Sequence, residues 1–432
     1  MTTHYLKRAK PSARPDATET TRIVEDMLDQ MRSEGEAATR RLSESLDSWN
    51  PESFVVDEQE IARAERSLST TLKDDILFAQ SQVRAFAEKQ RATLTEFEVE
   101  THPGLVVGQR QIPIDAAGCY VPGGRFAHLA SAAMSVITAK AAGVRHVTAS
   151  SPSRDGEGIH PATLYALAQA GADSILSLGG VQAIGAMAFG HFTGEPVSFL
   201  AGPGNRFVAE AKRLLYGEVG IDVVAGPTES LVIADDTADP WLVAVDLISQ
   251  AEHGIESQTI LISTSRTVAD RVLELIPQAL DQLPADSVAQ TAWDHLGEIA
   301  VVDSREEAAR LADEYANEHL QVHAADLDWW LHRLRNYGSL FLGEETTVTY
   351  GDKTSGPNHI LPTLGGARYT GGLWAGKFVK TVTYQRMTQK ANERVGRVAA
   401  RISRTEGMEG HALAADVRLQ KYFPDQPLDS TP

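Results

Sequence analysis

Hydrophobic and polar positions alternate differently in different parts of this chain. Between residues 21 and 93, apolar side chains recur at helical spacing, as at Ile23, Met27, Leu28 and Met31, among residues that favour helices. This predicts two long amphipathic helical regions, 21–47 and 61–93. Residues 1–20 are polar and contain two prolines, and they are predicted to form an N-terminal arm.

The middle of the chain changes to short β-branched runs that alternate with alanine-rich helical stretches. HVTASS, SILSLGG and SLVIADD are predicted strands, and after residue 240 the same alternation returns with SQTILISTS, EIAVVDS and GSLFLG. Strands alternating with helices of this length indicate βαβ units and parallel sheets. From about residue 385 the pattern is helical again. This tail is too small to bury a core alone, so it must dock on its own body or on another subunit.

Composition narrows the possible partners. The chain has 432 residues, 42% hydrophobic and 23% charged, with a net charge of −18 that would repel nucleic acid and anionic lipid. A single cysteine, Cys119, rules out an intrachain disulfide and a thiolate zinc site. We find no secretory apolar segment and no membrane-length apolar run, so a cytoplasmic protein is expected.

Four glycine-rich turns in the first α/β half are candidate ligand loops. They are YVPGGR (120–125), LGGVQAIG (178–185), AGPGN (201–205) and AGPTES (225–230). Glycines at the carboxyl ends of strands let backbone amides approach a phosphate, but they are also common in βα turns that bind no ligand. The GxGxxG fingerprint is absent, which argues against a standard Rossmann pyrophosphate loop.

Polar clusters supply the candidate chemistry. Gln250 and His253 in SQAEHG lie three positions apart, so on a helix they share one face and could hold a metal, or simply end the helix in solvent. Together with Asp352 and His411 they form a donor set that zinc accepts, although spacing alone supports this grouping weakly. Glu318 and His319 in ANEHL form an acid–base pair or, alternatively, a solvated helix end.

Taken in order, these motifs resemble the histidinol dehydrogenase family. The resemblance rests on YVPGG, GGVQAIGAMAFG, GPGN, AGPTESLVIAD, SQAEHG, NEHL and SGPNHILPT, and it runs from about residue 20 to 420. It implies an α/β fold of two incomplete Rossmann-like parallel-sheet domains with small helical terminal segments. It also implies a homodimer with exchanged C-terminal segments, one zinc per subunit, and NAD as acceptor in two successive oxidations of an alcohol to an acid. The domains would be 21–114 with 236–380, a second, NAD-binding domain over 115–235, and a C-terminal segment over 381–432.

The resemblance also implies residue roles. Zinc would be held by Gln250, His253, Asp352 and His411, with Glu318 and His319 as the catalytic pair. The NAD contacts would be Tyr120, Gln182 and Asn205, and the positions matching substrate contacts are Thr228 and Glu406. In this scheme His319 takes the hydroxyl proton, and Glu318 activates the water that hydrates the aldehyde.

Several positions depart from the histidine-biosynthetic pattern and resemble the branch that contains sulfopropanediol 3-dehydrogenase. Arg125 and His128 follow YVPGG, Thr228 stands where serine is usual, and Lys377 stands where aspartate is usual. A sulfonate needs cationic donors, so Arg125 and His128 are candidate substrate contacts. The expected reaction is 2,3-dihydroxypropane-1-sulfonate to 3-sulfolactate. The alternatives are L-histidinol oxidation, another small polyol, and a non-catalytic α/β binding protein.

Overall fold

The computed structural model describes residues 3–10, 17–123 and 127–428. Internal contacts divide the chain into two compact units. The larger unit comprises Met1–Arg91 and Ile114–Phe378, and the smaller unit comprises Ala92–Pro113 and Val379–Pro432. Within the described part of the chain, no helix is long and apolar enough to cross a bilayer.

One parallel sheet of the larger unit has six strands in the order β1-β11-β10-β9-β12-β13, and only β1 runs antiparallel to its neighbour. Alternate residues of β9 face opposite helical layers, because Val232 packs with α9 and α10 whereas Leu231 packs with α12 and α13. The strands are β1 (His4–Lys7), β9 (Glu229–Ala234), β10 (Gln258–Ser263), β11 (Glu298–Val301), β12 (His319–His323) and β13 (Ser339–Leu342). The helices are α9 (Pro240–Ala251), α10 (Arg266–Leu280), α11 (Ala289–Leu296), α12 (Arg305–Tyr315), α13 (Leu327–Arg333) and α14 (Val348–Lys353), with 3₁₀ turns η1 (Gly366–Arg368) and η2 (Ala375–Phe378).

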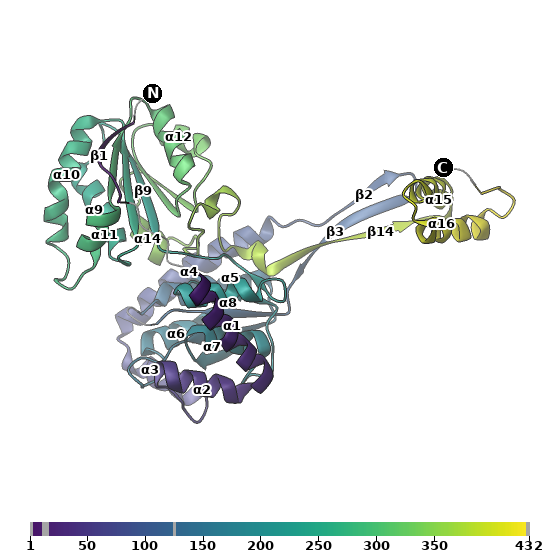
Figure 1. The fold of residues 1–432 in the computed structure, drawn as a ribbon, viewed down its shortest axis with the longest axis horizontal. Helices are drawn as coiled ribbons and strands as arrows, with labels where there is room; N and C mark the ends of the chain where they lie inside the picture. The colour runs from purple at the N-terminus through teal and green to yellow at the C-terminus, as the bar shows by residue number, and fades with distance from the viewer. Residues whose placement is uncertain (1–2, 11–16, 124–126, 429–432) are drawn as a thin grey trace. The chain divides into compact units, whose positions relative to one another are not determined.

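The second sheet of the larger unit is fully parallel and has five strands in the order β6-β5-β4-β7-β8. Its alternation of strands with alanine-rich helices confirms the predicted α/β class (Figure 1). The strands are β4 (Ala116–Tyr120), β5 (His146–Ser151), β6 (Ser174–Ser177), β7 (Phe199–Ala201) and β8 (Gly220–Ile221). The helices are α5 (Leu129–Ala142), α6 (Pro161–Ala170), α7 (Gly180–Phe189) and α8 (Arg206–Leu215).

The predicted N-terminal helical regions are helical, and each is divided in two. The first breaks at Gly35, whose φ of 67° lies in the left-handed region. The predicted grouping of residues 21–114 with the domain of the six-stranded sheet differs from the structure, which packs Leu28 and Met31 against α7, beside the five-stranded sheet. Gln80 likewise donates to the carbonyl of Ala166 on α6 at 2.8 Å. The helices are α1 (Ala17–Glu34), α2 (Glu36–Asp47), α3 (Glu58–Ser67) and α4 (Thr70–Ala92).

The smaller unit combines a long antiparallel sheet with two helices, where we predicted only the helical part. Its sheet, in the order β14-β3-β2, joins residues 97–113 to the chain after residue 378. The elements are β2 (Phe97–His102), β3 (Leu105–Pro113), β14 (Val379–Met387), α15 (Gln389–Thr405) and α16 (Glu409–Tyr422). The two helices pack on each other through Gly396 and Leu419, and Arg404 pairs with Asp416. Nearly every residue of β2 is exposed, which explains why hydrophobic alternation did not reveal it.

A buried ion pair fixes the AGPGN turn after β7. Lys212 on α8 and Asp222 after β8 have side chains only 2% and 0% exposed. The Lys212 ammonium donates to the Gly202 carbonyl at 2.9 Å, and the Asp222 carboxylate accepts from the Gly202 amide at 2.7 Å. Gly202 has φ 120°, and a Cβ there would lie 1.9 Å from the carbonyl oxygen of Tyr120. The turn therefore depends on this pair and on glycine.

Replacing Lys212 with methionine should lower the free energy of unfolding by about 3 to 5 kcal/mol, because the buried Asp222 carboxylate would lose its counter-charge. Urea unfolding followed by tryptophan fluorescence measures this change. Arg266→Met, which breaks an exposed ion pair with Asp270, is the control and should cost less than about 1 kcal/mol. Equal effects of the two substitutions would contradict a structural role for the buried pair.

Candidate functional site

Glu318 and His319 lie at the amino end of β12, between β9 and β13. Their residues are only 8% and 3% exposed, so the alternative of a solvated helix end is wrong. The Glu229 amide donates to a Glu318 carboxylate oxygen at 3.2 Å. This acid–base pair is held by the first residues of a central strand, which gives its backbone little freedom.

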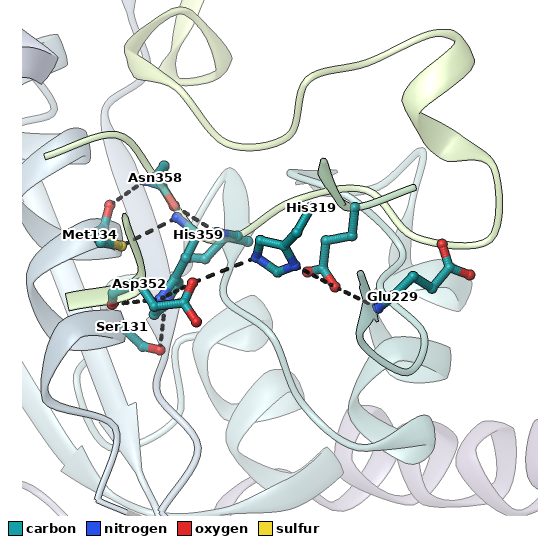
Figure 2. Close-up of polar contacts among 9 residues, drawn as sticks. Ser131, Met134, Glu229, His319, Asp352, Asn358 and His359 are labelled. Carbon is teal, nitrogen blue, oxygen red and sulfur yellow. Dashed lines mark hydrogen bonds and ion pairs between the residues drawn. The ribbon is translucent and has the colours of Figure 1, made fainter. Parts of the chain in front are cut away.

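A chain of carboxylate, imidazole and carboxylate runs through this pair (Figure 2). His319 Nδ1 lies 3.5 Å from Glu318, and its Nε2 lies 3.6 Å from Asp352 on α14. Both distances exceed ordinary hydrogen bonds, and neither ring nitrogen has another hydrogen-bond partner among the described residues. The two nitrogens of this buried imidazole therefore face carboxylates without a short hydrogen bond, which leaves the ring able to exchange a proton with a ligand.

Burial and mutual charge shift the pKa values of all three groups. Burial raises the pKa of Glu318 to about 7. Burial alone would lower the pKa of His319, but the Glu318 and Asp352 carboxylates outweigh it and raise that pKa to about 9. Burial likewise opposes ionisation of Asp352, yet the neighbouring His319 holds its pKa down at about 2. Such coupled, displaced pKa values are typical of catalytic groups.

One predicted zinc ligand of the larger unit has a buried oxygen with no hydrogen-bond partner among the described residues. Gln250 is buried at the end of α9, and its amide oxygen has no hydrogen-bond partner among the described residues. His253 keeps an exposed edge, although burial of its ring lowers its pKa while the charge of Asp352 opposes that shift. A free carbonyl oxygen, an imidazole and a carboxylate in one region are a donor set that fits zinc.

The fourth predicted ligand, His411, lies on α16 of the smaller unit and is exposed. Among the described residues, no group of three or more His, Cys, Asp or Glu side chains is arranged to hold a metal ion. The predicted set supplies only His253 and Asp352 of those residue types within the larger unit, because Gln250 is an amide. The four-ligand zinc set therefore stays a prediction.

His359 joins the site although we did not include it in the predicted set. Its Nδ1 lies 3.1 Å from the Asp352 carbonyl and its Nε2 lies 2.8 Å from the Ser131 hydroxyl on α5 (Figure 2). Since a carbonyl only accepts, Nδ1 carries the proton and Nε2 accepts from Ser131. Burial lowers the pKa of His359 to about 4, so it is neutral near pH 7. Its position in SGPNHILPT was the available signal.

The predicted substrate contacts fall in different places. Burial, followed by the charges of Lys353 and His253, lowers the pKa of His128 to about 4, and its substrate contact stays a prediction. Thr228 is half-buried directly before β9, next to Glu229. Glu406 is exposed at the end of α15 in the smaller unit. Arg125 lies outside the described residues.

The predicted NAD contacts gather at the carboxyl ends of the parallel strands of the second sheet. Tyr120 ends β4, and its hydroxyl accepts from the Gly180 amide at the start of α7 at 3.2 Å. Gln182 on α7 donates to the Asp47 carboxylate at 2.8 Å, and the Asn205 side chain caps α8. This edge is where ligands of open α/β sheets bind. The structure carries no cofactor, so these contacts stay predictions.

Comparisons with known proteins agree with this geometry. A family model described as histidinol dehydrogenase matches residues 10–419. A histidinol dehydrogenase homolog of Ruegeria pomeroyi is 55% identical over 98% of this chain and 98% of that protein. The sulfopropanediol 3-dehydrogenase of the same organism is 51% identical over 100% and 99%. The crystal structure of histidinol dehydrogenase from Elizabethkingia anophelis has a TM-score of 0.89 at 33% identity, covering 96% of this chain and 94% of that one.

Glu318→Gln should lower the pKa of His319 in zinc-free protein, because the substitution removes the first of the charges that raise it. The measurement is a pH titration of ¹³C-labelled histidine, with the His319 signal assigned by its loss in His319→Gln. Glu252→Gln, at an exposed carboxylate, is the control and should leave the His319 midpoint in place. An unchanged midpoint in Glu318→Gln would show that the Glu318 charge does not raise the pKa of His319.

Proposed function

This chain is a member of the histidinol dehydrogenase family, and we propose that it is a zinc- and NAD-dependent dehydrogenase that oxidises an anionic primary alcohol to a carboxylate in two steps. The substrate that the chain fits best is 2,3-dihydroxypropane-1-sulfonate, with 3-sulfolactate as product. The observation that carries the proposal is the buried chain of Glu318, His319 and Asp352.

The residues of the chain divide the proton transfers between them. When bound, zinc would polarise the substrate hydroxyl, and NAD would accept hydride. His319, whose ring nitrogens make no short hydrogen bond among the described residues, takes the hydroxyl proton in its neutral form. Asp352 favours a protonated His319, but the same carboxylate is a proposed zinc ligand, and a cation there would oppose that protonation. Glu318, whose pKa lies near 7, activates the water that converts the aldehyde into its hydrate.

The charges around the site support an anionic substrate. Lys353 is exposed directly after Asp352, and its positive charge contributes to the lowered pKa values of His128, His253 and His359. An ammonium this close to the site of a chain with net charge −18 gives an anion a local partner. The 51% identity to the sulfopropanediol 3-dehydrogenase of Ruegeria pomeroyi, against 37% to the histidinol dehydrogenase of the same organism, supports the sulfonate.

Oxidation of L-histidinol is the second candidate function, and the family membership favours it. A non-catalytic binding protein is a weaker alternative, because a binding surface has no need of a buried acid–base pair. Burying ionisable groups costs folding free energy unless they are paired. Retention of Glu318, His319 and Asp352 in this arrangement therefore supports an enzyme.

The smaller unit supports a homodimer with exchanged C-terminal segments. Large apolar side chains of this unit are exposed on its strands and helices, including Phe97 at 52%, Ile402 at 53% and Leu413 at 60%. Exposed apolar groups concentrated on one small unit mark an interaction surface. His411 and Glu406 lie exposed on the same unit. We propose that the occupant of this surface is a second copy of the chain, which would bring His411 to the partner's Asp352 region.

The purified enzyme with zinc should form two NADH per molecule of 2,3-dihydroxypropane-1-sulfonate, because oxidation to the acid removes two hydrides. Absorbance at 340 nm measures the stoichiometry.

Lys353→Gln should raise the KM for the sulfonate about tenfold or more while leaving the Kd for NAD unchanged, because the substitution removes the ammonium that would pair with the anion.

L-Histidinol, tested in parallel, is the decisive control for the substrate. Turnover of histidinol without turnover of the sulfonate would replace the proposed substrate by the alternative. Absence of turnover with both, in protein that binds neither zinc nor NAD, would favour the binding-protein reading.

Mixing inactive His319→Asn and His411→Ala dimers after subunit exchange should restore activity. In the mixed dimer one site combines the intact His319 of one subunit with the intact His411 of the other. Activity would approach about a quarter of the parent value, because about half of the dimers are mixed and each has one working site. If native mass spectrometry shows mixed dimers without activity, His411 serves its own subunit or none.

A further inference from the structure

A second buried polar cluster lies one layer below the catalytic pair. His319, Gln321 and His323 alternate along β12, so their side chains share one face of the sheet, whereas Leu320 and Val322 pack on the other. On α9, Asp246 and Gln250 lie at i and i+4 on one face, and His253 follows two residues after the helix ends at Ala251. Of these residues, His319, Gln250 and His253 belong to the proposed site. The other three, Asp246, Gln321 and His323, have no assigned role.

Asp246 is the centre of this lower cluster. The Gln321 amide donates to one carboxylate oxygen of Asp246, and His323 Nε2 lies 3.1 Å from the same oxygen. The other oxygen accepts from the Thr347 hydroxyl at 2.8 Å. The side chains of Gln321 and His323 are fully buried, so these contacts are shielded from water.

Thr347 connects this cluster to helix α14. It is the N-cap residue of α14, yet its hydroxyl makes no capping bond and donates instead to Asp246. A threonine at this position ordinarily accepts from its own helix. The bond ties the start of α14, which carries Asp352, to α9, which carries Gln250. Through Gln321 the same carboxylate reaches β12, which begins with His319.

We propose that Asp246 is a positioning residue that fixes α9, β12 and α14 relative to one another, so that Gln250, His253 and Asp352 are pre-arranged to bind zinc. This inference rests on the proposed function, since zinc is its ligand. Groups that orient metal ligands from outside the coordination sphere typically affect metal affinity about 10- to 100-fold. Among the described residues, the polar contacts of the Asp246 carboxylate go to Gln321, His323 and Thr347 and not to a predicted ligand side chain, so it acts by holding the three backbone segments in place.

The test is zinc affinity of the full-length, zinc-stripped protein, measured by competition with a chromophoric chelator. Thr347→Val removes the bond to α14 with almost no change of shape, and it should weaken zinc binding about tenfold. Asp246→Asn should weaken it at least as much. Thr347→Ser keeps the hydroxyl and should restore parent affinity. The zinc-free melting temperature of Thr347→Val should stay close to that of the parent.

Thr259→Val is the matched control. Thr259 is a buried threonine of the same sheet whose hydroxyl has no hydrogen-bond partner among the described residues, so its loss should leave zinc affinity unchanged. Parent-like affinity in both Thr347→Val and Asp246→Asn would overturn the proposal. So would a loss in Thr347→Ser as large as that in Thr347→Val.

Hydrogen exchange separates this proposal from the proposed function. Should the parent bind no zinc, the metal part of the function fails, but the positioning role predicts that Thr347→Val still speeds amide exchange in 348–353 and 249–256. Thr259→Val should not. Unchanged exchange in Thr347→Val, with or without zinc binding by the parent, would remove Asp246 as the link between these segments.

Discussion

The structure depends on keeping three ionisable side chains, Glu318, His319 and Asp352, buried beside one another. Any one of them alone in this position would be neutralised or would destabilise the fold. Their charges are coupled: the two carboxylates raise the pKa of His319, His319 lowers the pKa of Asp352, and burial raises the pKa of Glu318 to about 7. The arrangement places an acid–base pair beside a second carboxylate, and the surrounding strands and helices hold these groups in position.

The two sheets of the larger unit contribute to this arrangement in different ways. The six-stranded sheet presents the amino end of β12, where the acid–base pair lies. The five-stranded sheet presents carboxyl ends with glycine-rich turns, and its helix α5 supplies Ser131, which donates to His359. The Asn358 side chain also donates to the Met134 carbonyl of α5 at 2.8 Å. The loop containing His359 thus connects the Asp352 region to helix α5, which begins near the predicted NAD edge.

The sequence predicted the α/β alternation because most strands are apolar on both faces, as buried parallel strands are. The sequence did not indicate β12 because polar residues occupy one face of that strand, so His319, Gln321 and His323 interrupt its apolar pattern. It missed β4 because AAGCY has little β-branched character. The motifs indicated Glu318, His319 and Asp352, but the contacts that join His359 to Asp352 and Asp246 to Thr347 are tertiary, and spacing along the chain does not reveal them.

The smaller unit buries little apolar surface of its own. Its strand β2 is exposed on both faces, and the residues that its two helices bury are small ones, Leu419 and the ion-paired Asp416. So little buried apolar area cannot offset the conformational entropy of ordering these elements, so further contacts must stabilise them. If a second copy supplies those contacts, the surface that completes the fold of this unit also presents His411. Folding of the smaller unit, dimerisation and completion of the metal site would then be one linked equilibrium.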